Sequence, residues 1–399
     1  MGEARAAMTR FAPLAYGFRP FFLLAGLDAI FNMVLWLAVY LHPDLWPVNA
    51  TPAMYWHGHE MLFGFVAAAI GGFLLAAVPG WTGQKSYAGR PLAVLVAIWF
   101  AGRVAMLPYL AIPPAVAAAA DLAFFPALVA TLSPPLIRAH KLRNMPFLVL
   151  LTLLFAANLV FHLGCFGTVR DGEVIGLGMT LDIVLILIVV IGGRIIPAFT
   201  KSGFAQRGIA VRIVPREWLD IAAIAAVVAV LGGDIAVPHS AWSGALALAA
   251  ATLQAARLAQ WQGYRTLRDP LTWVLHAGYA WLVVGLVLKG LWLVAGLAFT
   301  EKWLHALTVG AFATMILAVM TRASLGHTGR ALIAPAPIAG AYLLISLATA
   351  ICVFRPALAP SDYDIVVTLA GSRWMGAFAI LLLIYAPILM RSRVDGKPG

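Results

Sequence analysis

Long apolar runs joined by short connections are the feature that most constrains this chain. Of its 399 residues, 63% are apolar and only 11% are charged, and the mean hydropathy is +0.93. A soluble domain of this size needs far more charge on its surface. Crossing roughly 30 Å of hydrocarbon takes a helix of roughly 20 mostly apolar residues. The sequence therefore predicts an all-α, polytopic membrane bundle.

The apolar runs that are long enough to cross a membrane number about twelve. The connections between them are too short to hold a soluble domain, and no convincing internal repeat is present. We therefore predict one transmembrane domain over residues 1–399, with the first span retained rather than cleaved as a signal peptide. The predicted spans are 20–41, 56–80, 91–110, 113–137, 144–166, 173–199, 217–232, 240–258, 271–297, 302–322, 333–353 and 373–391.

The placement of lysine and arginine predicts the orientation of the bundle, because basic residues favour the cytoplasmic side of a membrane. Of the 27 basic residues, 21 fall on one set of alternate connections, which includes both termini. We count Arg19, Arg257 and Arg322 among them. Both termini are thus predicted to be cytoplasmic. The net charge of +11 then indicates attraction to anionic membrane lipids and not nucleic-acid binding.

Four histidines reach a similar predicted depth near the outer face. His57 and His59 begin the second span, His162 ends the fifth, and His305 begins the tenth. A single histidine inside a membrane is most often a hydrogen-bonded packing residue, and for each one this interpretation stays open. Histidines that converge from separate helices, however, are typical of metal and cofactor sites in bundles. The set therefore predicts a metal centre in the outer half of the membrane.

The segment around His57 and His59 leaves two arrangements open. If it is helical, the two histidines point about 200° apart and serve separate sites. Glu60 then returns to the face of His57, which makes it a candidate proton donor and catalytic residue for that site. If the segment is extended, both histidines can bind one ion.

Charged residues inside the spans are costly and therefore point to function. Arg103 and Lys289 are candidates to bind a cofactor, such as the propionates of a haem. The alternatives are an ion pair with Asp121 or extension to the lipid head groups. Asp121 and the deeper Asp182 are candidates for a proton route. Arg194 is either a cofactor-positioning residue or an anchor at the basic face.

Several motifs, in order along the whole chain, resemble the NnrS family. This resemblance implies a bacterial inner-membrane protein that carries haem b and copper and acts in denitrification, nitric oxide metabolism and protection against nitrosative stress. It also keeps open a role for His276 as a ligand of a second haem, beside a packing role. The matching motifs are FRPFF at 18–22, HGHEMLFG at 57–64, GGRIIP at 192–197, HAGYAW at 276–281, HALTVG at 305–310, MTR at 320–322 and LGHTGR at 325–330.

Two functions compete for this chain. The first is an oxidoreductase that reduces nitric oxide, with His57, His59, His162 and His305 as metal ligands, Glu60 as the acid, and a quinol or a periplasmic carrier as electron donor. The second is a non-catalytic nitric oxide sensor, or a transporter of a metal or metal-nitrosyl complex. A purely structural subunit explains neither the histidines nor the buried charges.

Overall fold

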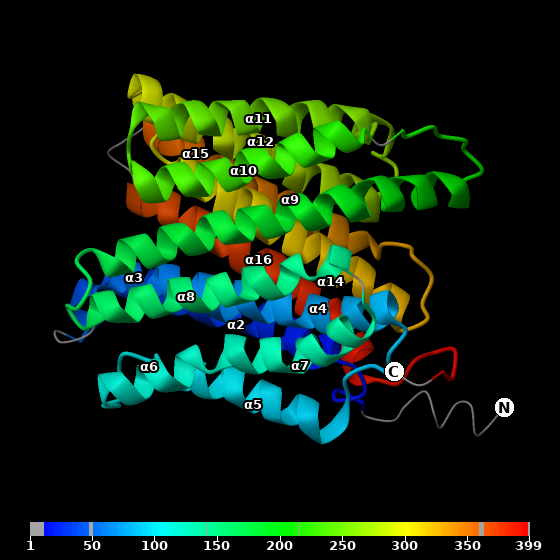
Figure 1. The fold of residues 1–399 in the computed structure, drawn as a ribbon, viewed down its shortest axis with the longest axis horizontal. Coiled ribbons are helices and arrows are strands. Elements are labelled where there is room, and N and C mark those ends of the chain that lie inside the picture. The colour runs from blue at the N-terminus through cyan, green and yellow to red at the C-terminus, as the bar shows by residue number, and fades with distance from the viewer. Residues whose placement is uncertain (1–11, 48–50, 141, 215, 359–362, 398–399) are drawn as a thin grey trace. The chain divides into compact units, whose positions relative to one another are not determined.

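The computed structural model describes residues 12–47, 51–140, 142–214, 216–358 and 363–397, and helices dominate this part of the chain. Ten helices within the described residues are long and apolar enough to cross a membrane, so the chain is a multi-pass membrane protein, as predicted. Each of the twelve predicted spans coincides with a helix or with consecutive helical segments (Figure 1). Two of them, α5 (Gly89–Ala105) and α11 (Ala241–Gln260), are not among the ten. The count of twelve spans therefore stays a prediction.

The chain divides into two compact units. Unit 1 comprises Met1–Thr180, Met320–Leu332 and Leu381–Gly399, and unit 2 comprises Leu181–Val319 and Ile333–Ile380. The chain passes between the units four times, within α9, α14 and α16 and in the connection between α14 and α15. The prediction of a single domain is not tested by this division and stays a prediction.

Unit 1 is built mainly from the first half of the chain. Within it α2 packs against α4 and η2, α5 packs against α6, and α7 packs against α4 and α8. The helical segments are α2 (Phe18–Leu41), η1 (Pro43–Leu45), α3 (Ala53–His59), η2 (Glu60–Val66), α4 (Ala67–Thr82), α5, α6 (Pro114–Leu122), α7 (Phe124–Arg138), η3 (Leu142–Asn144) and α8 (Pro146–Cys165).

Unit 2 is built mainly from the second half of the chain. There α10 packs against α11, α11 packs against α12, and both α12 and α15 pack against η6. The helix at the predicted sixth span, 173–199, is longer than the span, since α9 continues through Pro197 to Gln206. The segments from α9 onward are α9 (Gly172–Gln206), α10 (Glu217–Ala236), α11, η4 (Gly263–Arg265), α12 (Pro270–Ala295), η5 (Ala298–Thr300), α13 (Trp303–His305), η6 (Ala306–Ala313), α14 (Thr314–His327), α15 (Ala336–Leu358) and α16 (Tyr363–Met390).

Two of the long helices contain a π-helical segment, and each segment begins directly after a histidine. His59 is the last residue of α3 and precedes η2, while His305 is the last residue of α13 and precedes η6. Such wide turns occur frequently at functional sites. His59 and His305, two of the histidines predicted to contribute to a metal centre, therefore stand at an irregular turn.

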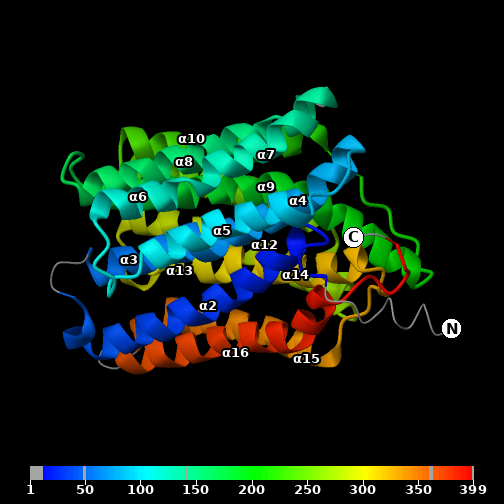
Figure 2. The ribbon, with the colours of Figure 1, turned by 90° about the horizontal axis from the view of Figure 1, so that it is seen from below.

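The described beginning and end of the chain meet in unit 1 (Figure 2). The amide of Ala12 donates to the carbonyl of Met390 at 2.8 Å, and Arg19 Nη1 donates to the carbonyls of Leu389 at 2.9 Å and Arg391 at 2.6 Å. Two ends on one side agree with an even number of spans. Which side of the membrane they face stays a prediction.

Three arginines that we counted with the basic connections are buried within helices. Arg19 is fully buried, and Arg257 and Arg322 are only 3% and 5% exposed. Arg19 satisfies the last carbonyls of α16, which would otherwise lack hydrogen-bond donors. This burial could not be predicted, because the sequence shows a charge near a helix end but not what packs over it. Arg5, Arg10 and Lys141, which belong to the same count, lie outside the described residues.

Candidate metal centre

A buried polar cluster in unit 1 brings together side chains from five helical segments. In both views α3, α6 and α8 lie at the same end of the molecule (Figures 1 and 2). None of the six residues is more than 8% exposed. The cluster, called here the His59 cluster, consists of His59 from α3, Glu60 from η2, Arg103 from α5, Asp121 from α6, and Asn158 and His162 from α8.

Asp121 is the centre of the cluster. Its Oδ2 accepts hydrogen bonds from Asn158 Nδ2 at 2.7 Å and from His162 Nε2 at 2.9 Å, and it lies 3.2 Å from His59 Nε2. Its Oδ1 accepts a hydrogen bond from Arg103 Nη2. The i, i+4 spacing of Asn158 and His162 does place both side chains on one face of their helix, against the same oxygen.

The surroundings of His59 are the second important feature of the cluster. Its Nδ1 donates to Glu60 Oε1 at 2.9 Å, and its Nε2 faces Asn158 Oδ1 at 3.1 Å as well as Asp121 Oδ2. Both of these facing atoms are acceptors, because the amide nitrogen of Asn158 is directed to Asp121. Without a proton, the lone pair of Nε2 would therefore face the lone pairs of these two oxygens at close range. Either a proton on Nε2 or a metal ion in its place removes this conflict.

The donor atoms of His59, Asp121 and His162 all lie within 4.8 Å of one another. Two imidazole nitrogens and one carboxylate oxygen form a donor set that suits iron, copper or zinc. Glu60 holds the other nitrogen of His59, as a carboxylate commonly does behind a histidine that binds a metal. The cluster therefore has the ligands and the outer hydrogen bonds of a metal site.

The packing around His59 fits an ion and does not fit a haem. The ring centroids of Phe161, Phe63 and His162 lie 4.5, 4.8 and 5.6 Å from that of the His59 imidazole. A haem plane would lie on the Nε2 side of the imidazole, where Asn158 Oδ1 and Asp121 Oδ2 already lie 3.1 and 3.2 Å from Nε2. A haem on this chain would have to use another histidine.

Two glycines allow the charged side chains to approach so closely. A Cβ on Gly64 would lie 2.5 Å from Asp28 Oδ2 and 3.3 Å from the Arg103 side chain. A Cβ on Gly102 would lie 3.0 Å from the backbone of Asp121. Asp28 Oδ2 is buried and has no hydrogen-bond partner in the described chain. Sequence reasoning missed both glycines, although a glycine directly before a buried arginine was a usable signal.

His57 lies apart from the His59 cluster. Its ring stacks on Trp36 with 4.4 Å between the centroids and 16° between the planes. The two histidines thus have separate surroundings, as expected for a helical segment, and the extended alternative is wrong. The expectation that Glu60 and His57 share a site stays a prediction. Glu60 contacts its neighbour His59 because the chain widens into a π-helix at this residue.

Arg103 forms the ion pair with Asp121 that we gave as the alternative to cofactor binding, and it also donates to Glu60 Oε1 at 2.7 Å. Lys289 has a different partner from the expected one. In unit 2 its Nζ pairs with Asp234, lies 3.7 Å from Asp182 Oδ1 and sits 5.0 Å from the centre of the Trp303 ring. Cofactor binding by Lys289 and a proton route through Asp182 stay predictions.

The remaining predicted residues also lie in unit 2. His305 Nδ1 is buried without a hydrogen-bond partner in the described chain, and His276 Nε2 lies 2.9 Å from Thr200 Oγ1. Arg194 is half-buried in α9 beside Gly193. None of the three is a member of the His59 cluster. Their roles as ligands or cofactor-binding residues stay predictions.

These features define a multi-pass α-helical membrane protein with a buried centre of histidine and carboxylate donors. The family model for NnrS protein matches residues 12–393, which is nearly the whole described chain. The chain therefore belongs to the NnrS family, as its motifs indicated, and this membership connects it with the response to nitric oxide. No curated protein matches the chain.

Proposed function

We propose that this protein binds nitric oxide at a copper ion in the His59 cluster and reduces it to nitrous oxide. One observation carries the proposal: His59 Nε2 faces two acceptor oxygens, a conflict that a proton or a metal ion removes. His162 directs its own nitrogen to the same carboxylate oxygen. The orientation derived from the basic residues puts the reaction in the outer half of a bacterial inner membrane.

Charge balance favours a monovalent ion in this buried place. Arg103 and a protonated His59 together carry two positive charges, and Glu60 and Asp121 carry two negative ones. Buried charge is tolerated when it is paired in this way. A copper(I) ion that replaces the proton on His59 Nε2 leaves the sum unchanged, and imidazole is a suitable ligand for copper.

The bound copper would supply an open position for nitric oxide and a route for electrons. The residues around it have separate tasks. Arg103 holds the Glu60 and Asp121 carboxylates at fixed positions, and Glu60 keeps the second nitrogen of His59 in its donating form. Glu60 is also the candidate acid. Once protonated, it would deliver protons to the reaction, in which two nitric oxide molecules, two protons and two electrons give nitrous oxide and water.

Haem b remains part of the proposed function, at a histidine other than His59. The candidates are His57, His305 and His276, which the sequence predicted and which lie outside the cluster. A non-catalytic sensor or transporter is the second candidate function. It is favoured by the buried charges of Lys289, Asp182 and Asp234, which suit a path through the membrane.

Metal content and gas production test the proposal. Purified protein is expected to contain stoichiometric copper and to form nitrous oxide from nitric oxide when a reduced dye supplies electrons. His59→Ala and His162→Ala should each weaken copper binding by about tenfold or more. His42→Ala, at an exposed histidine, is the matched control and should keep the copper. Copper retained in both cluster variants would contradict the site, and nitric oxide binding without nitrous oxide would favour a sensor.

Glu60→Gln separates the two tasks of this residue. The amide oxygen can still accept the His59 Nδ1 proton, so copper should remain at most about tenfold more weakly bound. Loss of the acid should lower the rate of nitrous oxide formation by roughly 10²-fold or more. Gas chromatography and copper analysis on the same sample measure both effects. Glu217→Gln, at an exposed glutamate, is the control, and an unchanged rate in Glu60→Gln would exclude Glu60 as the acid.

A further inference from the structure

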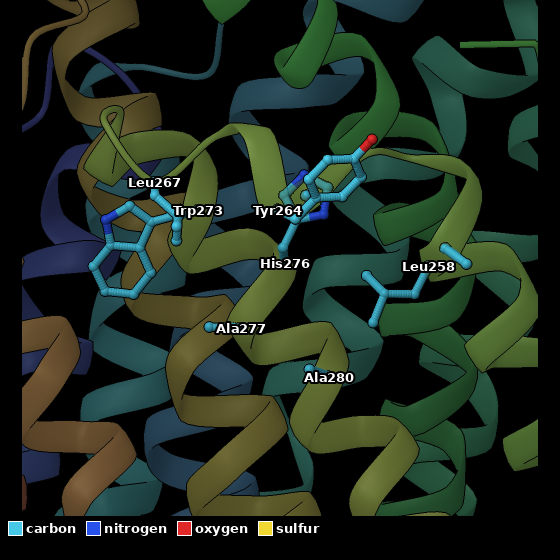
Figure 3. Close-up of a pocket in the computed structure, with 9 residues that line it drawn as sticks. Leu258, Tyr264, Leu267, Trp273, His276, Ala277 and Ala280 are labelled. Carbon is cyan, nitrogen blue, oxygen red and sulfur yellow. The ribbon is translucent and has the colours of Figure 1, made fainter.

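A pocket of about 390 Å³ lies in unit 2 beside His276. Its volume is in the range of small-molecule sites. Figure 3 shows Trp273 and Leu258 on either side of His276, with Ala277 and Ala280 further along the same helix. The pocket is lined by Leu258, Ala259, Gly263, Tyr264, Leu267, Trp273, His276, Ala277 and Ala280.

The walls of this pocket are apolar apart from His276 and Tyr264. Tyr264 and Leu267 border it and are 76% and 74% exposed, so an aromatic ring and an aliphatic side chain form its exposed rim. The alanines on α12 leave the space open where larger side chains would fill it. A site of this composition, near the first turns of a membrane helix, accepts an apolar ring from the bilayer more readily than a water-soluble molecule.

The hydrogen bonds around His276 fix which of its nitrogens carries the proton. Thr200 Oγ1 lies 2.7 Å from the carbonyl of Ile196 and donates its only proton there. It can therefore only accept from His276 Nε2, at 2.9 Å. In the neutral imidazole Nδ1 is then a bare acceptor, and it is buried without a hydrogen-bond partner in the described chain.

Gly263 lies against that acceptor at the pocket wall and presents no side chain to it. A Cβ at this position would lie 2.5 Å from His276 Nδ1, so any larger residue would cover the nitrogen. An unpartnered acceptor in an apolar site selects a ligand that brings a hydroxyl donor. The ligand class that combines a hydroxyl, an apolar ring and solubility in the bilayer is a quinol.

We propose that this pocket binds the head group of a membrane quinol, with a quinol hydroxyl donating to His276 Nδ1. The inference deepens the proposed function, on which it rests, by naming the electron donor. Oxidation of one quinol to a quinone releases two electrons and two protons. Reduction of two nitric oxide molecules to nitrous oxide and water consumes the same number of each. If His276 instead bound a haem iron through Nε2, the hydrogen bond between Nε2 and Thr200 would have to break.

Direct binding measurements test the pocket without any turnover. Duroquinol and its oxidised form, duroquinone, differ by two protons and two electrons, so only duroquinol carries hydroxyl donors. Calorimetric titration of the purified protein under argon, with empty micelles as blank, should show duroquinol binding about tenfold more tightly than duroquinone. Gly263→Ala and His276→Phe should each weaken duroquinol binding by about tenfold. Gly232→Ala, where a Cβ meets no atom within 4 Å, is the control and should bind as the parent does.

Equal affinity for quinol and quinone would overturn the proposal, as would unchanged quinol binding in His276→Phe. A haem or metal ion lost specifically with His276 would overturn it as well. Because Gly263→Ala crowds the imidazole, this variant could fail to fold. In that case His276→Phe, which keeps a ring and removes Nδ1, decides whether His276 binds the quinol. The parent protein could bind duroquinol through His276 but form no nitrous oxide with a reduced dye. This outcome would support the quinol pocket and contradict nitric oxide reduction.

Discussion

Replacing Asp121 by asparagine is expected to remove copper and nitrous oxide production together and to destabilise unit 1. The amide would place an N–H group among donors from Arg103, Asn158 and His162, and it would leave the cluster with an excess positive charge. Removing one partner of a buried ion pair typically lowers the free energy of unfolding by about 3–5 kcal/mol. Copper analysis and the thermal midpoint of the purified variant measure the two effects separately.

A double variant separates the metal role of Asp121 from its structural role. Arg103→Gln added to Asp121→Asn removes the uncompensated charge, so much of the lost stability should return while copper stays absent. Asp171→Asn is the matched control, because it makes the same chemical change at a carboxylate whose side chain is 73% exposed. Parent levels of copper in Asp121→Asn would show that His59 and His162 do not need this carboxylate.

The helices could be predicted from the sequence because crossing a membrane leaves a strong signal in every apolar run. The charges could be recognised one by one for the same reason. Arg103, Asp121, His59 and His162 were each expected near one depth, and the structure brings all four together in unit 1. The family resemblance, which the family model confirms over residues 12–393, predicted the connection with nitric oxide.

The pairing of side chains could not be predicted, since it depends on helix contacts and local backbone geometry. Glu60 contacts His59 rather than His57 because the π-helix begins at that residue. Lys289 pairs with Asp234, a residue that drew no attention in the sequence. Arg257 looked like a residue of the basic face, yet α9 and α12 cover it. For Lys289 and Arg257 the deciding partner is distant in the chain, and for Glu60 the local backbone geometry decides.

Gly193→Ala is expected to destabilise unit 2 more than any other glycine-to-alanine change in α9. A Cβ at this position would overlap the guanidinium of Arg257. This arginine has little freedom to move, because it donates to Asp220 Oδ1 at 2.6 Å, to the carbonyl of Val189 at 2.9 Å and to Tyr279 Oη at 3.1 Å. Displacing a buried guanidinium from such partners should cost about 3–5 kcal/mol. The yield of monodisperse protein and its thermal midpoint in detergent measure the loss.

Two comparisons show whether the arginine is the cause. Gly178→Ala changes the same helix at a point where a Cβ meets no atom within 4 Å, so it should leave the midpoint unchanged or slightly raised. Arg257→Met in the Gly193→Ala background removes the overlapping group and leaves Asp220, whose side chain is 35% exposed, within reach of water. The double variant should therefore lose less stability than the two single losses added together. Strict additivity would mean that Gly193 is required for some other contact of α9.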